Sequence, residues 1–401
     1  MVILKQQLSV GMCLLSLLST QLQAEGIVDF EPYVRAGVMF DDNLFRFASK
    51  AEADAAGFSS QSDRVNTLDA GARLNLRLSR QMVRMTASLN DNKYNRNDFL
   101  DNTGKSYGIA WDWRIGDDVF GELSTNHSQS IAGFSDNDII VRNLRTFKSQ
   151  RASINWRVLS SLTVYGLTEN SDFENEELVF QPLDREDTSY EMGTRYQSLS
   201  GTQVGLFYRN LTSDYVNRTG NTALIFGRKN EQNQVGLNLT WTPTLKSRLS
   251  GQISTIRFIR EDALQDNFNG INQRWNFDYA LSGKTSIGFT AYRELTSVDD
   301  LLSTYVLFKG AGANANWNAT SKLSVSTSYS IGKREFLGGS SVFSLPIERE
   351  DDTKRFGINV AYLPTEHASL QLRFVDEERE SSIRNFGYQF QSVNFIGQYN
   401  F

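Results

Sequence analysis

Two histidines in a chain of 401 residues leave little room for acid–base or nucleophilic catalysis. His127 follows Ser124 and Asn126, and a hydrolase built from these residues would need all three side chains in one hydrogen-bonded array. Polar residues near the end of a strand explain the same cluster without chemistry. The second histidine, His367, falls in a predicted short turn. We therefore predict no catalytic residues and no enzymatic activity.

Paired carboxylates do not define a site either. Glu176 and Glu177 fall in a predicted loop, as do Asp351 and Asp352, whereas a glycosidase holds two carboxylates a fixed distance apart across a cleft. The sequence shows no phosphate-binding loop, metal-spaced cluster or haem motif, so neither a cofactor nor a metal is expected. The formal net charge of −5 argues against nucleic acid, which binds clustered Lys and Arg.

Arginine is the residue type whose placement suggests a function. Arginines recur opposite apolar positions, together with Asn, Gln and Ser, and would form one wet surface. Arg pairs with carboxylates through two hydrogen bonds, while Asn and Gln match sugar hydroxyls. Such a surface either solvates the lumen of any channel or lines a path for a large hydroxylated or anionic molecule. The predicted pore-lining residues are Arg73, Arg77, Arg84, Arg151, Arg157, Arg195, Arg209, Arg274, Arg355 and Arg373.

Strands with alternating side chains would position these arginines. Residues 68–78 carry Leu or Ala at every even position, with Asp, Gly, Arg or Asn between them. A strand sends alternate side chains to opposite faces, whereas a helix spaces its apolar residues three and four apart. About eighteen segments of about 10–15 residues follow this rule, which suits tilted membrane strands. Further examples are residues 83–89, 107–113, 235–241, 323–329 and 356–362.

The last nine residues, VNFIGQYNF, carry the clearest strand pattern. Val393, Phe395, Tyr399 and Phe401 alternate with residues that are polar except for Ile396. In a soluble sandwich this segment would be an exposed apolar edge, but in a barrel its apolar face meets lipid. The aromatic terminus also resembles the C-terminal signal of bacterial outer-membrane barrels. That resemblance implies recognition by the barrel-assembly machinery.

Residues 1–24 are predicted to be a signal peptide. Lys5 supplies the positive charge, residues 8–18 form the apolar run, and Leu-Gln-Ala precedes Glu25. Cys13 is the only cysteine and lies inside the apolar run, so we expect neither a lipid anchor nor a disulfide in the mature chain. The mean hydropathy of −0.39 is compatible with a barrel, because only half of each strand faces lipid.

The links between strands alternate in length. Short turns are expected near 79–82, 115–118, 158–161, 199–202, 243–246, 282–285, 318–321 and 363–368, and longer links near 41–65, 96–103, 130–142, 174–186, 214–228, 261–270, 298–303, 336–352 and 381–385. Outer-membrane barrels have short periplasmic turns and long outer loops. We therefore predict that residues 25–401 form one all-β domain. Its fold would be a transmembrane up-and-down antiparallel β-barrel of about 18 strands, with both termini periplasmic. The sequence leaves open whether the link 41–65 or 336–352 folds inward.

Aromatic residues cluster before the predicted short turns. Trp113, Trp156, Trp241 and Trp317 each precede one of these turns, and Tyr362 holds the same place in its hairpin. Such rings are stable where an apolar layer meets water. The pattern predicts an aromatic girdle at the periplasmic interface.

Residues 29–47 carry a family resemblance. The segment FEPYVRAGVM at 30–39 and the following FDDNLFRF at 40–47 resemble the opening of EpsL-type exopolysaccharide-biosynthesis outer-membrane proteins, part of a wider β-barrel porin group. The resemblance implies a role in exporting or assembling an exopolysaccharide, without a defined active site. The first three motif residues could ligate a cation, although Asx hydrogen bonding at a strand end is the simpler interpretation. The motif residues are Asp41, Asp42, Asn43, Leu44, Phe45 and Arg46.

Three functions are consistent with this sequence. The first is a passive, hydrated outer-membrane channel for exopolysaccharide export, to which periplasmic export proteins deliver the polysaccharide. The second is a general or small-solute porin with no polysaccharide role. The third is an outer-membrane enzyme or structural scaffold. In each case outer-membrane lipid and lipopolysaccharide would surround the barrel.

Overall fold

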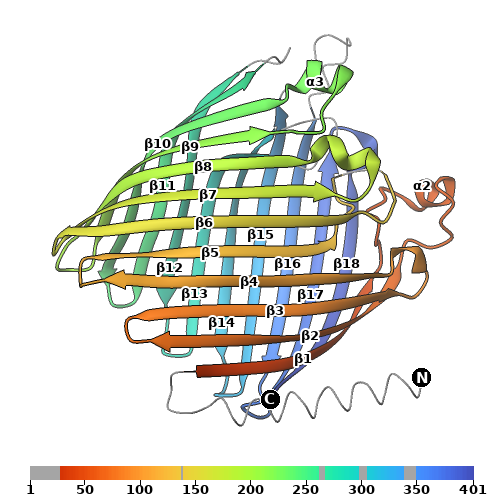
Figure 1. The fold of residues 1–401 in the computed structure, drawn as a ribbon. Coiled ribbons are helices and arrows are strands. Elements are labelled where there is room, and N and C mark those ends of the chain that lie inside the picture. The colour runs from red at the N-terminus through yellow and green to blue at the C-terminus, as the bar shows by residue number, and fades with distance from the viewer. Residues whose placement is uncertain (1–27, 137–138, 262–266, 298–304, 338–348) are drawn as a thin grey trace.

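A computed structural model of the chain describes residues 28–136, 139–261, 267–297, 305–337 and 349–401. The predicted signal peptide, residues 1–24, lies outside these described residues. Within them, eighteen strands form a single antiparallel sheet that closes into a barrel (Figure 1). No helix in this part of the chain is both long and apolar enough to cross a membrane.

The strands run up and down in chain order. The first nine are β1 (Val28–Asp41), β2 (Asp63–Leu78), β3 (Gln81–Tyr94), β4 (Asn102–Ile115), β5 (Val119–Ile131), β6 (Leu144–Leu159), β7 (Leu162–Asn175), β8 (Arg185–Gln197) and β9 (Gln203–Asp214). The second nine are β10 (Lys229–Thr244), β11 (Ser247–Glu261), β12 (Phe268–Ala280), β13 (Thr285–Ser297), β14 (Tyr305–Asn318), β15 (Leu323–Leu337), β16 (Glu350–Tyr362), β17 (Ala368–Ser381) and β18 (Tyr388–Asn400). The links contain the short helices α2 (Lys50–Ala55) and α3 (Gly220–Phe226), and the 3-10 turns η1 (Asp98–Leu100), η2 (Leu178–Leu183) and η4 (Arg384–Phe386).

Closure of the barrel joins the two ends of the chain. β1 pairs with β2 on one side and with β18 on the other, from Tyr33 opposite Asn400 to Asp41 opposite Ser392. The backbone N–H of Phe401 donates to the carbonyl of Pro32, 2.9 Å away. Each strand therefore has hydrogen-bonded neighbours on both sides, as a sheet in hydrocarbon requires. The start of β1 at Val28 and the end of β18 at Asn400 both lie at the short-turn end of the barrel.

The period-two pattern assigns the two faces of the wall. Large apolar side chains such as Leu89, Trp111 and Phe395 are about half exposed on the outer face. The residues between them point into the barrel, where Arg, Asn, Gln and Ser dominate. Soluble cores bury apolar side chains, so a wall with apolar groups outside and polar groups inside is the arrangement that suits lipid.

The predicted links agree with the structure to within a few residues. The short turns 79–80, 116–118 and 160–161 are examples, and the strands are 12 to 16 residues long. One difference concerns Asp351 and Asp352, for which the sequence predicts a loop. Both lie in β16, and the side chain of Asp351 is fully buried. The residues 298–303 and most of 336–352 lie outside the described part.

The expected aromatic girdle is present on the outer face near the short turns. Trp156, Trp241, Trp317 and Tyr362 expose between 43% and 55% of their surface there. Trp113 is less exposed because its ring lies over the cross-strand partner position, Gly121. A Cβ at that glycine would come within 2.6 Å of the indole ring, so the tight fit requires glycine.

Candidate channel and its constriction

The inner wall is rich in arginine, whereas the lysines of the described strands lie on the outer wall. The strand register places all ten predicted arginines on the inner face, opposite the exposed apolar residues. In the described strands every lysine is on the outer face and close to the long links. These lysines are Lys93, Lys105, Lys148, Lys229, Lys309, Lys333 and Lys354. The inner wall thus uses the cation that forms planar, bidentate contacts.

Most of these arginines are balanced by acids on neighbouring strands. Ion pairs join Arg73 to Glu31 (3.7 Å), Arg84 to Asp112 (3.0 Å), Arg151 to Glu169 (3.7 Å), Arg209 to Glu191 (2.5 Å), Arg274 to Glu294 (2.5 Å) and Arg355 to Glu377 (2.5 Å). Arg77, Arg157, Arg195 and Arg373 have no ion pair within the described residues, and the first three lie beside short turns. The lumen is therefore largely charge-balanced, and its free arginines lie mostly near one mouth.

The link between β5 and β6 crosses the lumen. Residues 132–136 leave β5 and reach β15 and β17, and β15 lies eight positions from β5 around the ring of strands. Asp136 Oδ1 lies 2.7 Å from Arg334 Nη1 and 3.3 Å from Arg379 Nη1. Arg379 also donates to the backbone carbonyl of Ser135. We call residues 132–136 the crossing segment. It connects β5 to the opposite wall at the long-link end of the barrel.

The far wall holds the crossing segment with a buried ionic cluster. Asp351 accepts hydrogen bonds from Arg334 Nη2 (2.8 Å), Arg349 Nη2 (2.9 Å) and the Ser381 hydroxyl (2.6 Å). The arginine side chains are 3% to 5% exposed, and the Asp351 side chain has no exposed surface. Since an unpaired buried charge is very costly, this cluster is a rigid anchor. Asp136 completes it from the lumen side.

The first long link folds against the crossing segment. Leu44, Phe45 and Phe47 are buried and form a small apolar core with Leu100. Phe134 of the crossing segment packs edge-on against Phe45, with ring centroids 4.9 Å apart. The question that the sequence left open for 41–65 is thereby answered. Residues 44–47 of this link pack inward at the mouth of the barrel, against the crossing segment and Phe390 of β18.

The FDDNLFRF motif builds this inward turn. Arg46, with a positive φ of 62°, forms an ion pair with Asp41 at 2.9 Å and stacks over the ring of Phe390. Asn43 bonds the backbone carbonyls of Phe47 (2.8 Å) and Gln389 (2.9 Å). Asp42 accepts from the backbone of β18 at 2.7 Å. The motif's polar groups are thus used by the protein itself. Among the described residues no group of His, Cys, Asp and Glu is arranged to hold a metal ion.

The imagined Ser/His/Asn array does not form. Ser124 and Asn126 face the lumen, where the Ser124 hydroxyl donates to Glu122 at 3.1 Å. His127 faces outward and stacks on Tyr107, with ring centroids 4.5 Å apart. One residue of offset along a strand reverses the face, so the wall separates these side chains.

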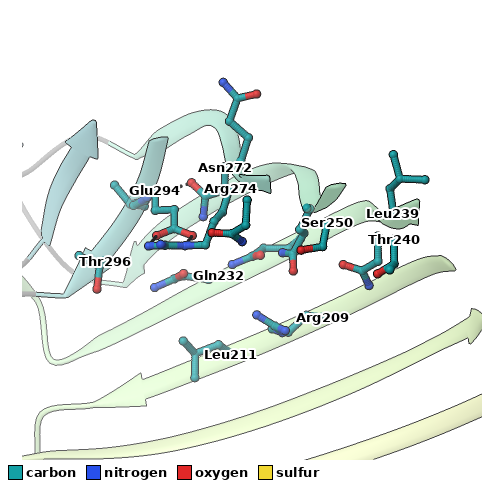
Figure 2. A pocket seen from close by; sticks show the side chains of 17 residues that line it. Arg209, Leu211, Gln232, Leu239, Thr240, Ser250, Asn272, Arg274, Glu294 and Thr296 are labelled. Atoms are coloured by element: carbon teal, nitrogen blue, oxygen red, sulfur yellow. Dashed lines mark hydrogen bonds and ion pairs between the residues drawn. The ribbon is translucent and has the colours of Figure 1, made fainter. Parts of the chain in front are cut away.

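A hollow on the inner wall of β9–β13 is lined mainly by amide side chains, in contrast to the ionic cluster that holds the crossing segment. It measures about 600 Å³ and is also lined by Arg209 and Arg274. Figure 2 shows Arg209, Gln232 and Arg274 around the same space, each from a different strand. The strand pattern predicts that these amides face the lumen, because they occupy the inner-face positions of three consecutive strands. The residues of the crossing segment carried no comparable signal.

Comparison with known proteins shows the fold. No protein-family model and no curated protein sequence matches the chain. Solved structures do match: OpdQ of Pseudomonas aeruginosa has 13% identity and a TM-score of 0.52, covering 93% of this chain and 98% of its own. OccK2 (OpdF) of P. aeruginosa in complex with glucuronate has 10% identity and a TM-score of 0.52, and the match covers 93% of this chain and 97% of OccK2. A BenF-like porin of P. fluorescens has 12% identity and a TM-score of 0.53, and the match covers 94% of this chain and 98% of that porin. The chain has the closed 18-stranded barrel fold of these porins, but no match supports the resemblance to EpsL-type proteins.

Proposed function

We propose that this protein is a passive channel of a bacterial outer membrane for small hydrophilic solutes. The observation that carries the proposal is the closed barrel with an apolar exterior, a polar interior and a mouth narrowed by its own links. A barrel of this strand number leaves room for water unless its links fill it. The crossing segment and the first long link reduce the opening, which favours small solutes over a polymer.

The similar proteins support the proposed size of the solutes. One of these proteins is a BenF-like porin, and another was solved in complex with glucuronate, a single sugar acid. The wall arginines and amides of this chain offer hydrogen bonds to solutes of that size. The chain holds no recognisable energy-transducing motif, so gradients would drive movement.

The test is reconstitution of the folded protein in lipid. We expect stepwise, ohmic currents in planar bilayers, and liposomes that swell faster in a monosaccharide than in a tetrasaccharide. Heat-modifiable gel mobility would verify folding, and protein-free liposomes would serve as the control. Folded protein that gives neither current nor swelling would reject the channel and favour a scaffold.

The outer surface supports the proposed orientation, with long links facing outward. The outer-face lysines all lie near those links. All of them except Lys105 pair with acids among the described residues, as in Lys148–Glu174 at 2.6 Å and Lys333–Glu350 at 2.7 Å. Charged side chains at this level suit the phosphate-rich layer of lipopolysaccharide, and the aromatic girdle suits the opposite interface. Both termini would then be periplasmic.

The terminal residue is proposed to act in assembly. Phe401 packs edge-on against Tyr399 with ring centroids 5.1 Å apart, at the seam where the barrel closes. We expect deletion of Phe401 to lower the amount of folded barrel in the outer membrane while leaving refolding in detergent intact. Phe401→Tyr, which keeps an aromatic terminus, should behave as wild type. Equal losses in cells and in detergent would instead indicate a purely structural role.

Exopolysaccharide export, with periplasmic export proteins as partners, is the less supported proposal. It depends on the resemblance over residues 29–47, and the side chains of that motif are occupied in packing the first link. A deletion strain decides between the two. Secreted polysaccharide at wild-type levels would eliminate the export role, whereas slower uptake of small solutes would support the porin.

A further inference from the structure

The hollow on the wall of β9–β13 combines amides with compensated charges. Among its lining residues, the inner-face amides are Gln232, Gln234, Asn238, Gln252, Asn272 and Asn276. Asn238 and Gln252 are direct cross-strand neighbours, and Gln252 is in turn opposite Arg274. Adjacent strands therefore present a continuous surface of donors and acceptors.

Both arginines of the hollow are neutralised locally. Arg209 Nη2 lies 2.5 Å from Glu191, and its Nε donates to the same carboxylate at 2.7 Å. Arg274 binds Glu294 through Nε (2.9 Å) and Nη2 (2.5 Å). Each guanidinium thus has its own carboxylate, and the formal charge of the site is zero. An anion would gain little here, because it would compete with a carboxylate already in place.

The amides, in contrast, are available. Asn272 and Asn276 use their oxygens on the Leu295 N–H and the Thr290 hydroxyl, both at 2.9 Å. Gln232, Asn238 and Gln252 make no side-chain hydrogen bond within the described residues. A carboxamide offers both a donor and an acceptor, which is what a hydroxyl needs. The volume of about 600 Å³ falls within the range of ligand sites, roughly 300–1,000 Å³.

We infer that this hollow is a subsite for neutral polyhydroxylated solutes, the chemical class of sugars. The inference rests on the proposed channel function and deepens it by naming a solute class. Amides and an ion-paired arginine can each exchange water for a sugar hydroxyl without leaving a buried charge unpaired. Binding at an open wall is weak, so a solute can leave towards either mouth. The site would favour neutral sugars over sugar acids of the same size.

Direct binding tests the subsite without requiring current. Saturation-transfer NMR on the detergent-solubilised barrel would compare raffinose, a neutral trisaccharide, with glucuronate. We expect raffinose to bind the wild type better than glucuronate. The double substitution Asn238→Leu with Gln252→Leu should weaken raffinose by about tenfold, since two hydrogen-bonding groups are lost. Asn359→Leu, which removes an inner-face amide of β16 outside the hollow, is the matched control.

Each outcome separates the subsite from the channel. Raffinose binding that is absent in folded wild type, or unchanged in the double variant, overturns the subsite. Glucuronate that binds more tightly and is lost in the same variant overturns the neutral-sugar assignment. If the protein conducts but does not bind raffinose, the channel proposal stands and the subsite proposal is wrong. If it binds raffinose but does not conduct, the subsite proposal stands and the channel proposal is wrong. Gln232→Leu provides the test if the double variant fails to fold.

Discussion

Asp136→Ala is expected to release the crossing segment and raise both the conductance and the current noise of the open channel. The Asp136 carboxylate contacts both Arg334 and Arg379 on the far wall, and its side chain is about one-quarter exposed. Charge-assisted hydrogen bonds of this kind contribute about 1.5–3 kcal/mol, so their loss favours the undocked segment by about ten- to a hundredfold. Single-channel recording at constant salt measures the effect directly.

Ser135→Ala is the matched control for this experiment. Arg379 contacts the backbone carbonyl of Ser135, so the substitution keeps that hydrogen bond while altering the neighbouring side chain. We expect wild-type currents from it. If Asp136→Ala also gives wild-type currents, packing of Phe134 against Phe45 holds the segment by itself, and the ionic contact does not set the size of the opening.

Acid should release the same contact only at low pH. Burial raises the pKa of Asp136, but the positive charges of Arg334 and Arg379 outweigh burial and hold the pKa below its ordinary value. A carboxylate with a lowered pKa keeps its contribution above the ordinary value of about 3.9 and loses it as pH falls through the lowered one. Conductance should be flat from neutral pH to about 4 and rise below that. Asp136→Asn should abolish the rise.

Asp351→Ala is expected to destabilise the barrel by about 3–5 kcal/mol. This carboxylate has no exposed surface, and its removal leaves Arg334 and Arg349 without the anion that both contact. Arg334 keeps its contact with Asp136, but breaking a buried ion pair still costs far more than losing a surface pair. Urea unfolding of the detergent-solubilised protein, followed by tryptophan fluorescence and gel mobility, measures the loss.

Asp352→Ala provides the comparison within the same strand. Asp352 is the next residue of β16, and alternation puts its exposed side chain on the outer face. A surface carboxylate contributes about 0–1 kcal/mol, so this variant should unfold close to wild type. Coincident unfolding of the two variants would show that the buried cluster reorganises without cost.

Strand geometry made most of the wall predictable from sequence. Once a segment is a strand, alternate side chains must face opposite sides. The apolar even positions of residues 68–78 face outward, so Arg73 and Arg77 at odd positions face inward. The same rule would have assigned Arg334 and Arg379 to the inner face. Alternation could not predict the partners of these two arginines. It assigns a side chain to the inner or outer face, but it does not say how deep in the barrel the side chain lies or which strand lies opposite it across the lumen.

The narrowing of the mouth was decided only by tertiary structure. Asp136 and Arg334 are 198 residues apart in the chain, and their contact exists because β1 pairs with β18 and closes the ring. The first long link is mostly polar, but its Leu44, Phe45 and Phe47 are buried. Their burial depends on packing against Phe134, which belongs to a different link. Local alternation is set by backbone geometry and can be read residue by residue. Contacts across the lumen depend on the barrel's closure, which no single segment encodes.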